Sequence, residues 1–218
     1  MKADLLEFLK DLKNNNNREW FQENKSRYEK ARTEFEAYIN KLIPRIREFD
    51  PEIGMLTARD CMFRIYRDVR FATDKSPYKT NMGAYIARGG KGTTMPGYYV
   101  HMEPGSSFLA GGLYMPPPEI LKKIRDEIYF QPEEFKNIVF NKSFIRVFGE
   151  IDDSEKLKTA PKGYPKDFPD LNLIKFRNYA VMHWVTDEQT LSEVYDDYAI
   201  EVFKVLLPLN EYFYNLLK

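Results

Sequence analysis

The chain has 218 residues, which is enough for one well-buried domain, and its 43% hydrophobic and 15% aromatic content is sufficient for a packed core. The 33 basic and 33 acidic residues cancel, so no overall field favours nucleic acid or an anionic membrane, and attraction to an anion has to be local. The single cysteine, Cys61, excludes an intramolecular disulfide and a cysteine-based zinc cluster. Because the start has no apolar signal core and no apolar run reaches membrane length, we expect a cytoplasmic protein without a membrane partner.

Apolar residues at helical spacing predict two helices in the first fifty residues. A short amphipathic helix ends at the asparagine tract 14–17, which is typical of a turn that caps the next helix. From Arg18 onward the pattern predicts one long helix, with Pro44 inside it and Asp50-Pro51 at its end. Its apolar stripe comprises Tyr28, Ala31, Phe35, Tyr38, Leu42, Ile46 and Phe49.

The middle of the chain changes to a two-residue period. Four short strands are predicted in succession, without helices between them, and this favours an antiparallel meander. The glycine-rich segment 89–97 connects the second and third strands as a hairpin loop, from which Lys91 could cover a neighbouring pocket. The predicted strands are residues 62–71, 81–88, 98–103 and 107–115.

The second half of the chain returns to helical patterns. The prolines at 116–118 precede a predicted helix, a second short helix starts at Pro132, and residues 150–170 are expected to form a surface loop. Residues 178–185 are a further strand candidate, and a last helix runs from Asp187 with Pro208 kinking or splitting it. We therefore expect one α+β domain over residues 1–218, with a central antiparallel sheet packed by long N-terminal and C-terminal helices.

The stretch FRIYRDVRFATDKSPYK, residues 63–79, combines a strand-like apolar period with many charges. If residues 62–71 form a strand, Arg67 lies on the apolar face and Arg64, Asp68 and Arg70 lie on the other. A guanidinium on the apolar face needs a carboxylate, a bound anion or access to water, because its desolvation costs several kcal/mol.

Between residues 59 and 79, six basic and three acidic residues leave a local charge of +3. Guanidinium groups bind phosphate or carboxylate through two parallel hydrogen bonds. The turn at residues 74–77 should bring the chain back alongside the strand. The sequence therefore predicts a pocket for a small anionic ligand, in which cations hold the anion, an aspartate orients them and a phenol donates a hydrogen bond. Its residues are Arg64, Arg67, Asp68, Arg70, Lys75, Tyr78 and Lys79.

Two other interpretations remain open at this point. The arginines and aspartates could form an internally paired network in a structural or partner-docking protein. Binding of single-stranded nucleic acid is disfavoured by the zero net charge. Whether a reaction is catalysed is undecided, with Tyr78, His101 and Asp68 as candidate proton-transfer groups. We expect no metal, because only two isolated histidines are present, and no cofactor.

The motif Arg64-x-x-Arg67-Asp68-x-Arg70-Phe71, followed by Asp74-Lys75-x-x-Tyr78-Lys79, resembles the signature of a bacterial and fungal family of conserved hypothetical proteins, the domain of unknown function 2461. The resemblance extends over nearly the whole chain. It implies one compact α+β domain and makes residues 64–79 the preferred site. Further similar stretches are NNNNREWFQENKSRY (14–28), GYYVHMEPG (97–105), GGLYMPPP (111–118) and APKGY (160–164).

Overall fold

Residues 2–49 form a layer of helices in the computed structural model, which describes residues 2–151 and 155–218. The predicted long helix is divided in two, because the chain turns at Asn24. The side chain of Asn17 accepts a hydrogen bond from the Trp20 amide at 2.9 Å and starts the first of the two, as the asparagine tract predicted. The layer consists of α1 (Lys2–Asn14), α2 (Arg18–Glu23) and α3 (Lys25–Phe49), followed by the short η1 (Pro51–Ile53) and α4 (Ala58–Cys61).

A four-stranded antiparallel sheet in the order β1-β2-β3-β4 lies at the centre of the described chain. Three of the predicted meander strands are confirmed, and the strand candidate at 178–185 supplies the fourth. The glycine loop between the first two strands contains one short turn of helix, η2 (Gly90–Gly92). The strands are β1 (Met82–Ala87), β2 (Gly97–Met102), β3 (Ser107–Leu113) and β4 (Tyr179–Val185).

The predicted strand at 62–71 is wrong, because this segment forms only isolated bridges. Met62 bridges Ala84 at the free edge of β1, but the chain then leaves the sheet and pairs with its own return stretch through a bridge between Tyr66 and Tyr78. Beyond that bridge no second strand supports an apolar face, so Phe71 is 95% exposed instead of buried. We call residues 62–80 the basic segment.

The second half of the chain supplies the remaining helices. The helices predicted after the proline run and at Pro132 are confirmed, whereas α7 and the short α8 were not predicted. The last helix, predicted to run from Asp187, is divided in two at residues 192–194, and Pro208 lies inside the second part, which does not end there. Residues 152–154 of the predicted surface loop lie outside the described residues. These elements are α5 (Pro118–Phe130), α6 (Pro132–Val139), α7 (Lys142–Phe148), α8 (Leu171–Ile174), α9 (Asp187–Leu191) and α10 (Tyr195–Leu217).

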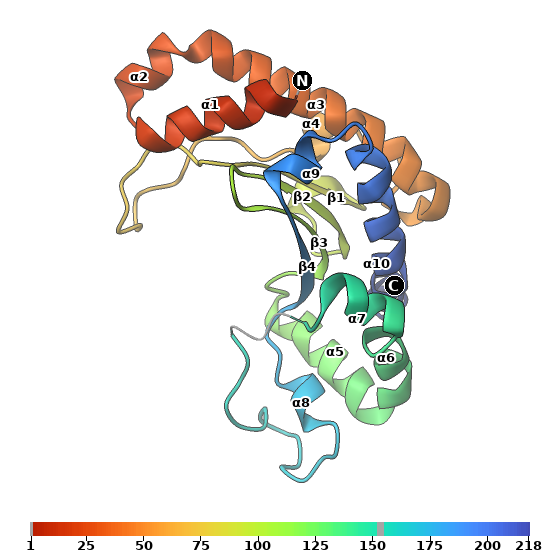
Figure 1. Cartoon of the computed structure of the whole chain (residues 1–218). Helices are drawn as coiled ribbons and strands as arrows, with labels where there is room; N and C mark the ends of the chain where they lie inside the picture. Colours follow the sequence, from red (N-terminus) through yellow and green to blue (C-terminus); the bar gives the residue numbers. More distant parts are fainter. Residues whose placement is uncertain (1, 152–154) are drawn as a thin grey trace.

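The elements are arranged in layers around the sheet (Figure 1). The N-terminal helices lie at one end, α5 to α8 at the other, and α10 runs along one face of the sheet between them. Gly111 of β3 permits this close approach, because a Cβ there would lie 2.2 Å from a methyl group of Leu206. The buried ring of Tyr98 packs edge-on against Phe203 of α10, with 5.1 Å between centroids.

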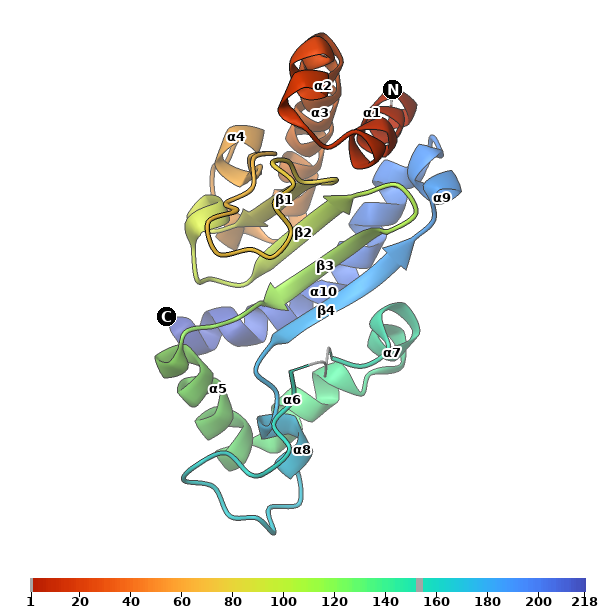
Figure 2. The ribbon, with the colours of Figure 1, turned by 90° about the vertical axis from the view of Figure 1, so that its left-hand side faces the viewer.

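The other face of the sheet is less covered. Figure 2 looks onto it, with α10 behind the strands and the basic segment in front of β1. Trp184 of β4 is 60% exposed on this face. The alternation along each strand thus divides the sheet into a buried side and an open side.

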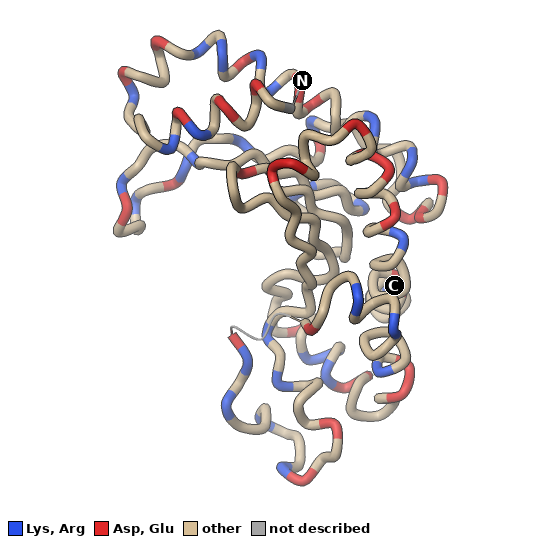
Figure 3. Tube along the Cα trace, in the orientation of Figure 1, with Lys and Arg blue, Asp and Glu red and all other residues tan. Residues whose placement is uncertain are grey.

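Charged residues avoid the sheet and concentrate on the helices and loops (Figure 3). The four strands contain no Lys, Arg, Asp or Glu, which fits their position between the helical layers. Among the described helices, none is long and apolar enough to cross a membrane.

Candidate functional site

The basic segment is a narrow loop whose two sides are held together by backbone hydrogen bonds. The Arg67 amide donates to the Pro77 carbonyl at 3.0 Å, and the Lys79 amide donates to the Ile65 carbonyl at 2.8 Å. The predicted chain reversal is therefore confirmed, although it builds a separate loop and not an addition to the sheet. Asn16 fixes the loop to the helical layer, because its side chain accepts from the Tyr78 amide and donates to the Tyr78 carbonyl.

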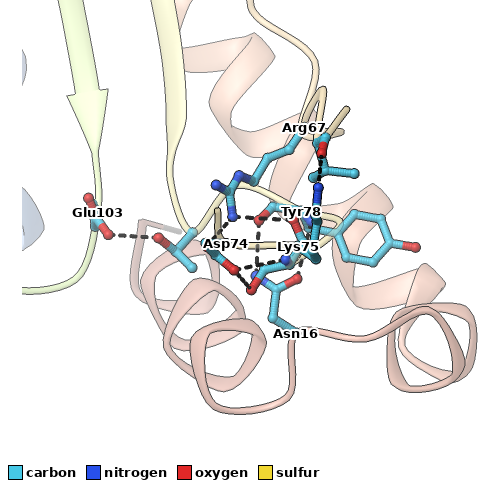
Figure 4. A network of polar contacts seen from close by, with 9 residues as sticks. Asn16, Arg67, Asp74, Lys75, Tyr78 and Glu103 are labelled. Atoms are coloured by element: carbon cyan, nitrogen blue, oxygen red, sulfur yellow. Dashed lines mark hydrogen bonds and ion pairs between the residues drawn. The ribbon is translucent and has the colours of Figure 1, made fainter. Parts of the chain in front are cut away.

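Arg67 is occupied inside this loop (Figure 4). Its guanidinium pairs with the Asp74 carboxylate and donates to the Ser76 carbonyl at 3.2 Å. The hydroxyl and the amide of Ser76 also donate to Asp74, and together with Arg67 they hold the pKa of that carboxyl well below its usual range. Asp74 is thus the carboxylate partner that was expected for a guanidinium among the apolar residues of this segment.

Arg70 and Lys75 are occupied as well. Arg70 donates two hydrogen bonds to Asp68, at 2.9 and 2.6 Å, and these lower the pKa of the Asp68 carboxyl. Lys75 donates to the Val69 carbonyl at 3.0 Å. These contacts hold both cations at the exposed end of the loop, and neither of them lines the cavity described below.

Tyr78 and Lys79 lie at the base of the loop. The Tyr78 ring stacks on Phe21 with 3.9 Å between centroids, and burial raises the pKa of its phenol. The Lys79 ammonium lies 5.4 Å from the centre of the Phe63 ring. Its pKa is lowered, first by burial and second by the positive charge of Arg64.

Arg64 is the member of the predicted set that lines a cavity. This cavity, of about 630 Å³, lies between α3, α4, the start of the basic segment, the beginning of β1 and the glycine loop. We call it the basic cavity. Its lining residues are Tyr28, Arg32, Arg59, Met62, Phe63, Arg64, Ile65, Tyr66, Asn81, Met82 and Lys91.

The lining of the basic cavity contains four cations and no carboxylate. Arg59 pairs with Glu36 at 3.2 Å outside the lining, and Lys91 donates to the Arg59 carbonyl at 2.7 Å. Within the described part of the chain, Arg32 and Arg64 form no ion pair. The cavity therefore has a local excess of positive charge in a protein whose net charge is zero.

Three of the four cations that line the cavity, Arg32, Arg59 and Lys91, are outside the site predicted from the sequence. Arg32 follows Tyr28 by one helical turn on α3, a spacing that places both side chains on one face. The sequence contains that signal, although the apolar stripe of the helix gives no reason to select Arg32. Arg59 was counted in the local charge without a role, whereas Lys91 lines a cavity as the glycine loop suggested.

His101 belongs to a separate hydrogen-bonded chain on the open side of the sheet. Its Nδ1 lies 3.1 Å from the Tyr99 hydroxyl and its Nε2 lies 3.2 Å from the Glu103 carboxylate, which also accepts a hydrogen bond from the Thr80 hydroxyl. Burial lowers the pKa of His101 although Glu103 opposes this effect. A neutral ring that donates to Glu103 accepts from Tyr99, which fixes its tautomer.

None of the three proton-transfer candidates, Tyr78, His101 and Asp68, is among the residues that line the basic cavity. Among the described residues, no three His, Cys, Asp or Glu side chains gather as metal ligands. The arrangement around the cavity can thus bind and orient an anion, using guanidinium and ammonium groups from four elements.

The fold and the cavity define the chain as an α+β protein with one antiparallel sheet and a cation-lined hollow at the edge of that sheet. Comparison with protein families finds a match over residues 4–212 to the conserved hypothetical proteins of the DUF2461 family. The chain belongs to this family, as the sequence motifs indicated. Neither the curated proteins nor the solved structures contain a match to the chain.

Proposed function

We propose that the protein binds a small organic anion, with a phosphate or carboxylate group, in the basic cavity. One observation carries the proposal: four cations and no carboxylate line a single hollow, and Arg32 and Arg64 have no ion pair within the described chain. Cations held close together repel each other, and a bound anion relieves this repulsion.

The supporting geometry favours binding over catalysis. Arginine binds planar and tetrahedral anions through paired hydrogen bonds, and a volume of about 630 Å³ lies in the range of small-molecule sites, roughly 300–1,000 Å³. The described lining offers tyrosine hydroxyls and the Asn81 amide beside the cations, but no histidine or carboxylate that could act as a general base.

Thermal stabilisation by anions tests the proposal. Nucleotides, sugar phosphates and dicarboxylates are each added at about 10 mM, and a Kd near 1 mM would then stabilise the native state by about 1.4 kcal/mol. For a chain of this size the melting temperature would rise by about 3–6 °C. We expect Arg64→Gln to abolish this rise and to leave the melting temperature of the free protein nearly unchanged.

The matched control is Arg70→Gln, since Arg70 belongs to the same segment but is bound to Asp68 outside the cavity. This variant should keep the full response to anions. Equal losses in both variants, or no response of the native protein to any anion in the panel, would refute the proposal. A short single-stranded oligonucleotide in the same panel tests the nucleic-acid alternative, which predicts a response that small anions do not give.

A structural role is a second candidate for part of the segment. It is favoured by the internal pairing of Arg67 with Asp74 and of Arg70 with Asp68. On this interpretation these pairs stabilise the loop and contribute nothing to the cavity. The Arg67 variant described in the Discussion tests it.

A cytoplasmic location is also a proposal. It is supported by Cys61, a free thiol buried in the core, which suits a reducing compartment. Cell fractionation tests it, and recovery of the protein outside the cytoplasmic fraction would contradict it.

A further inference from the structure

The basic cavity combines its cations with aromatic rings. Tyr28, Phe63 and Tyr66 line the same hollow as the four cations. A site for a bare inorganic anion needs hydrogen-bond donors and has no use for such rings. The chemistry of the wall therefore indicates a ligand with two parts, one charged and one flat and apolar.

Two of these rings are exposed at the cavity. Tyr66 is 50% exposed and Phe63 is 39% exposed, whereas most aromatic residues of the chain are buried or partly buried. Leaving such rings in contact with water forgoes stabilisation that burial would supply, at about 25 cal/mol for each Å² of apolar surface. Their exposure has an explanation if a ligand covers them.

The same rings are fixed in place from behind by residues outside the lining. Phe63 packs edge-on against Tyr99, with 6.3 Å between centroids, and Tyr66 packs against Phe21 and Tyr78 at 6.1 and 5.5 Å. Since these neighbours do not line the cavity, they hold the two rings from the protein side. The rings are thus preorganised, which lowers the entropic cost of stacking a ligand on them.

The charge of the cavity favours a phosphate over a single carboxylate. Arg59 pairs with Glu36, whereas the other three lining cations, Arg32, Arg64 and Lys91, form no ion pair within the described chain. A phosphate monoester carries a charge of about −1.5 to −2 near neutral pH and offers three strong acceptor oxygens. It therefore balances this group of cations more fully than one carboxylate does.

We propose that the ligand of the basic cavity is an organic phosphate that carries a flat ring, such as a nucleoside monophosphate. This inference rests on the proposed anion binding and adds the class of ligand. The phosphate contacts Arg64 and its neighbouring cations, and the ring stacks on Phe63 or Tyr66. Such stacking on an aromatic side chain is sequence-tolerant and occurs with any base.

The test compares the affinities of four probes by calorimetric titration: adenosine 5′-monophosphate, ribose 5-phosphate, adenosine and inorganic phosphate. We expect adenosine 5′-monophosphate to bind at least about fivefold more tightly than ribose 5-phosphate, as base stacking implies. Tyr66→Leu should weaken the monophosphate about fivefold or more and leave ribose 5-phosphate within about twofold. The matched control is Tyr114→Leu, because Tyr114 is also exposed, at 71%, but lies outside the cavity.

The outcomes separate the two proposals. Equal binding of the monophosphate and ribose 5-phosphate, with no effect of Tyr66→Leu or of a second variant, Phe63→Leu, would overturn the ring-stacking inference and leave anion binding intact. Binding of adenosine as tight as that of its monophosphate, unchanged in Arg64→Gln, would overturn both. Failure of all four probes to bind would also overturn both.

Discussion

Arg64 and Arg67 belong to the same short motif but have opposite surroundings. Arg64 faces a cavity and forms no ion pair within the described chain, whereas Arg67 pairs with Asp74 and donates to the Ser76 carbonyl. A cation that already has its partners contributes to the fold, and one without partners is available to a ligand. The two positions should therefore respond differently to the same substitution.

Replacement of Arg67 by glutamine should destabilise the protein without weakening its binding of anions. Arg67→Gln removes the pair with Asp74, and because such partly exposed pairs contribute modestly, the melting temperature should fall by only about 1–4 °C. Anion-dependent stabilisation should be retained, in contrast to Arg64→Gln. Thermal unfolding with and without ligand measures both effects. A variant that keeps its stability but loses the anion response would assign Arg67 to the site and contradict this division.

At the scale of elements, the contacts of β1 with its neighbours depend on one small residue, Gly83. A Cβ at Gly83 would lie 2.4 Å from the Tyr99 hydroxyl oxygen, so the absence of a side chain lets that hydroxyl reach His101. Gly83 also accepts a hydrogen bond from the Phe63 amide at the cavity wall. Gly83 therefore connects β1 both to the hydrogen-bonded chain of His101 and to the wall of the basic cavity.

The substitution Gly83→Ala should thus disturb the sheet locally. Overpacking of this kind costs about 1–3 kcal/mol, and displacement of the Tyr99 ring should break its hydrogen bond to His101. Chemical denaturation measures the loss of stability, and the ring nitrogen shifts of His101 report the lost bond. Gly92→Ala serves as a control, since nothing lies within 4 Å of its Cβ position. Equal stabilities of the two variants would contradict the packing described for Tyr99.

The junction between α3 and η1 contains a buried carboxyl group. Asp50 is 1% exposed, and burial raises its pKa although the Tyr98 hydroxyl and the Glu52 amide donate to it at 2.7 and 3.1 Å. Because the folded state holds this proton more tightly than the unfolded state, the contribution of Asp50 to stability falls as pH rises through the window between the two pKa values.

Asp50→Asn should consequently gain stability relative to the native protein as the pH rises from about 3 to about 7. The variant lacks this titration, whereas the carboxylates with lowered pKa, such as Asp68 and Asp74, act in both proteins and cancel in the difference. Urea denaturation at several pH values measures the difference. A shift in favour of the native protein over this range would contradict the raised pKa.

The sequence predicted the helices and strands whose apolar pattern faces the core over many residues. It did not predict the structure of the basic segment, where local hydrogen bonds determine the path of the chain. The stripes of α3 and α10 and the alternation of β1 to β4 extend over many residues, and each faces one core. The basic segment has the same alternation, but only Ile65 among its apolar face is buried, because hydrogen bonds to residues 77–79 take the chain away from β1. The alternation of apolar and polar residues alone does not show where the chain leaves the sheet.

The sequence predicts that a site for an anion lies near Arg64, but it does not predict which other residues belong to that site. The charge excess around Arg64 is visible in the sequence, and so is the turn that returns the chain at residues 74–77. The contributions of Arg32 from α3 and of Arg59 from α4 depend on contacts between elements distant in sequence. Tertiary packing brought these side chains together, and no spacing within the basic segment could show it.

At the scale of the whole molecule, the helical layer and the sheet meet at the edge strand β1. The layer of α1 to α3 lies at one end of the sheet and α5 to α8 lie at the other, while α10 joins them along the buried side (Figures 1 and 2). The basic cavity occupies the contact between the first layer and the sheet, where four elements supply cations. A ligand there would bridge these layers and should stabilise them against each other.

A crystal structure of the protein with 4-bromophenyl phosphate tests the central claim most directly, since anomalous scattering from bromine locates the ring independently of the phosphate. The account predicts phosphate oxygens within hydrogen-bond distance of Arg64 and at least one other lining cation, with the bromophenyl ring against Phe63 or Tyr66. Phosphate bound instead at the exposed loop end, among Arg67, Arg70 and Lys75, with only water in the basic cavity, would contradict it.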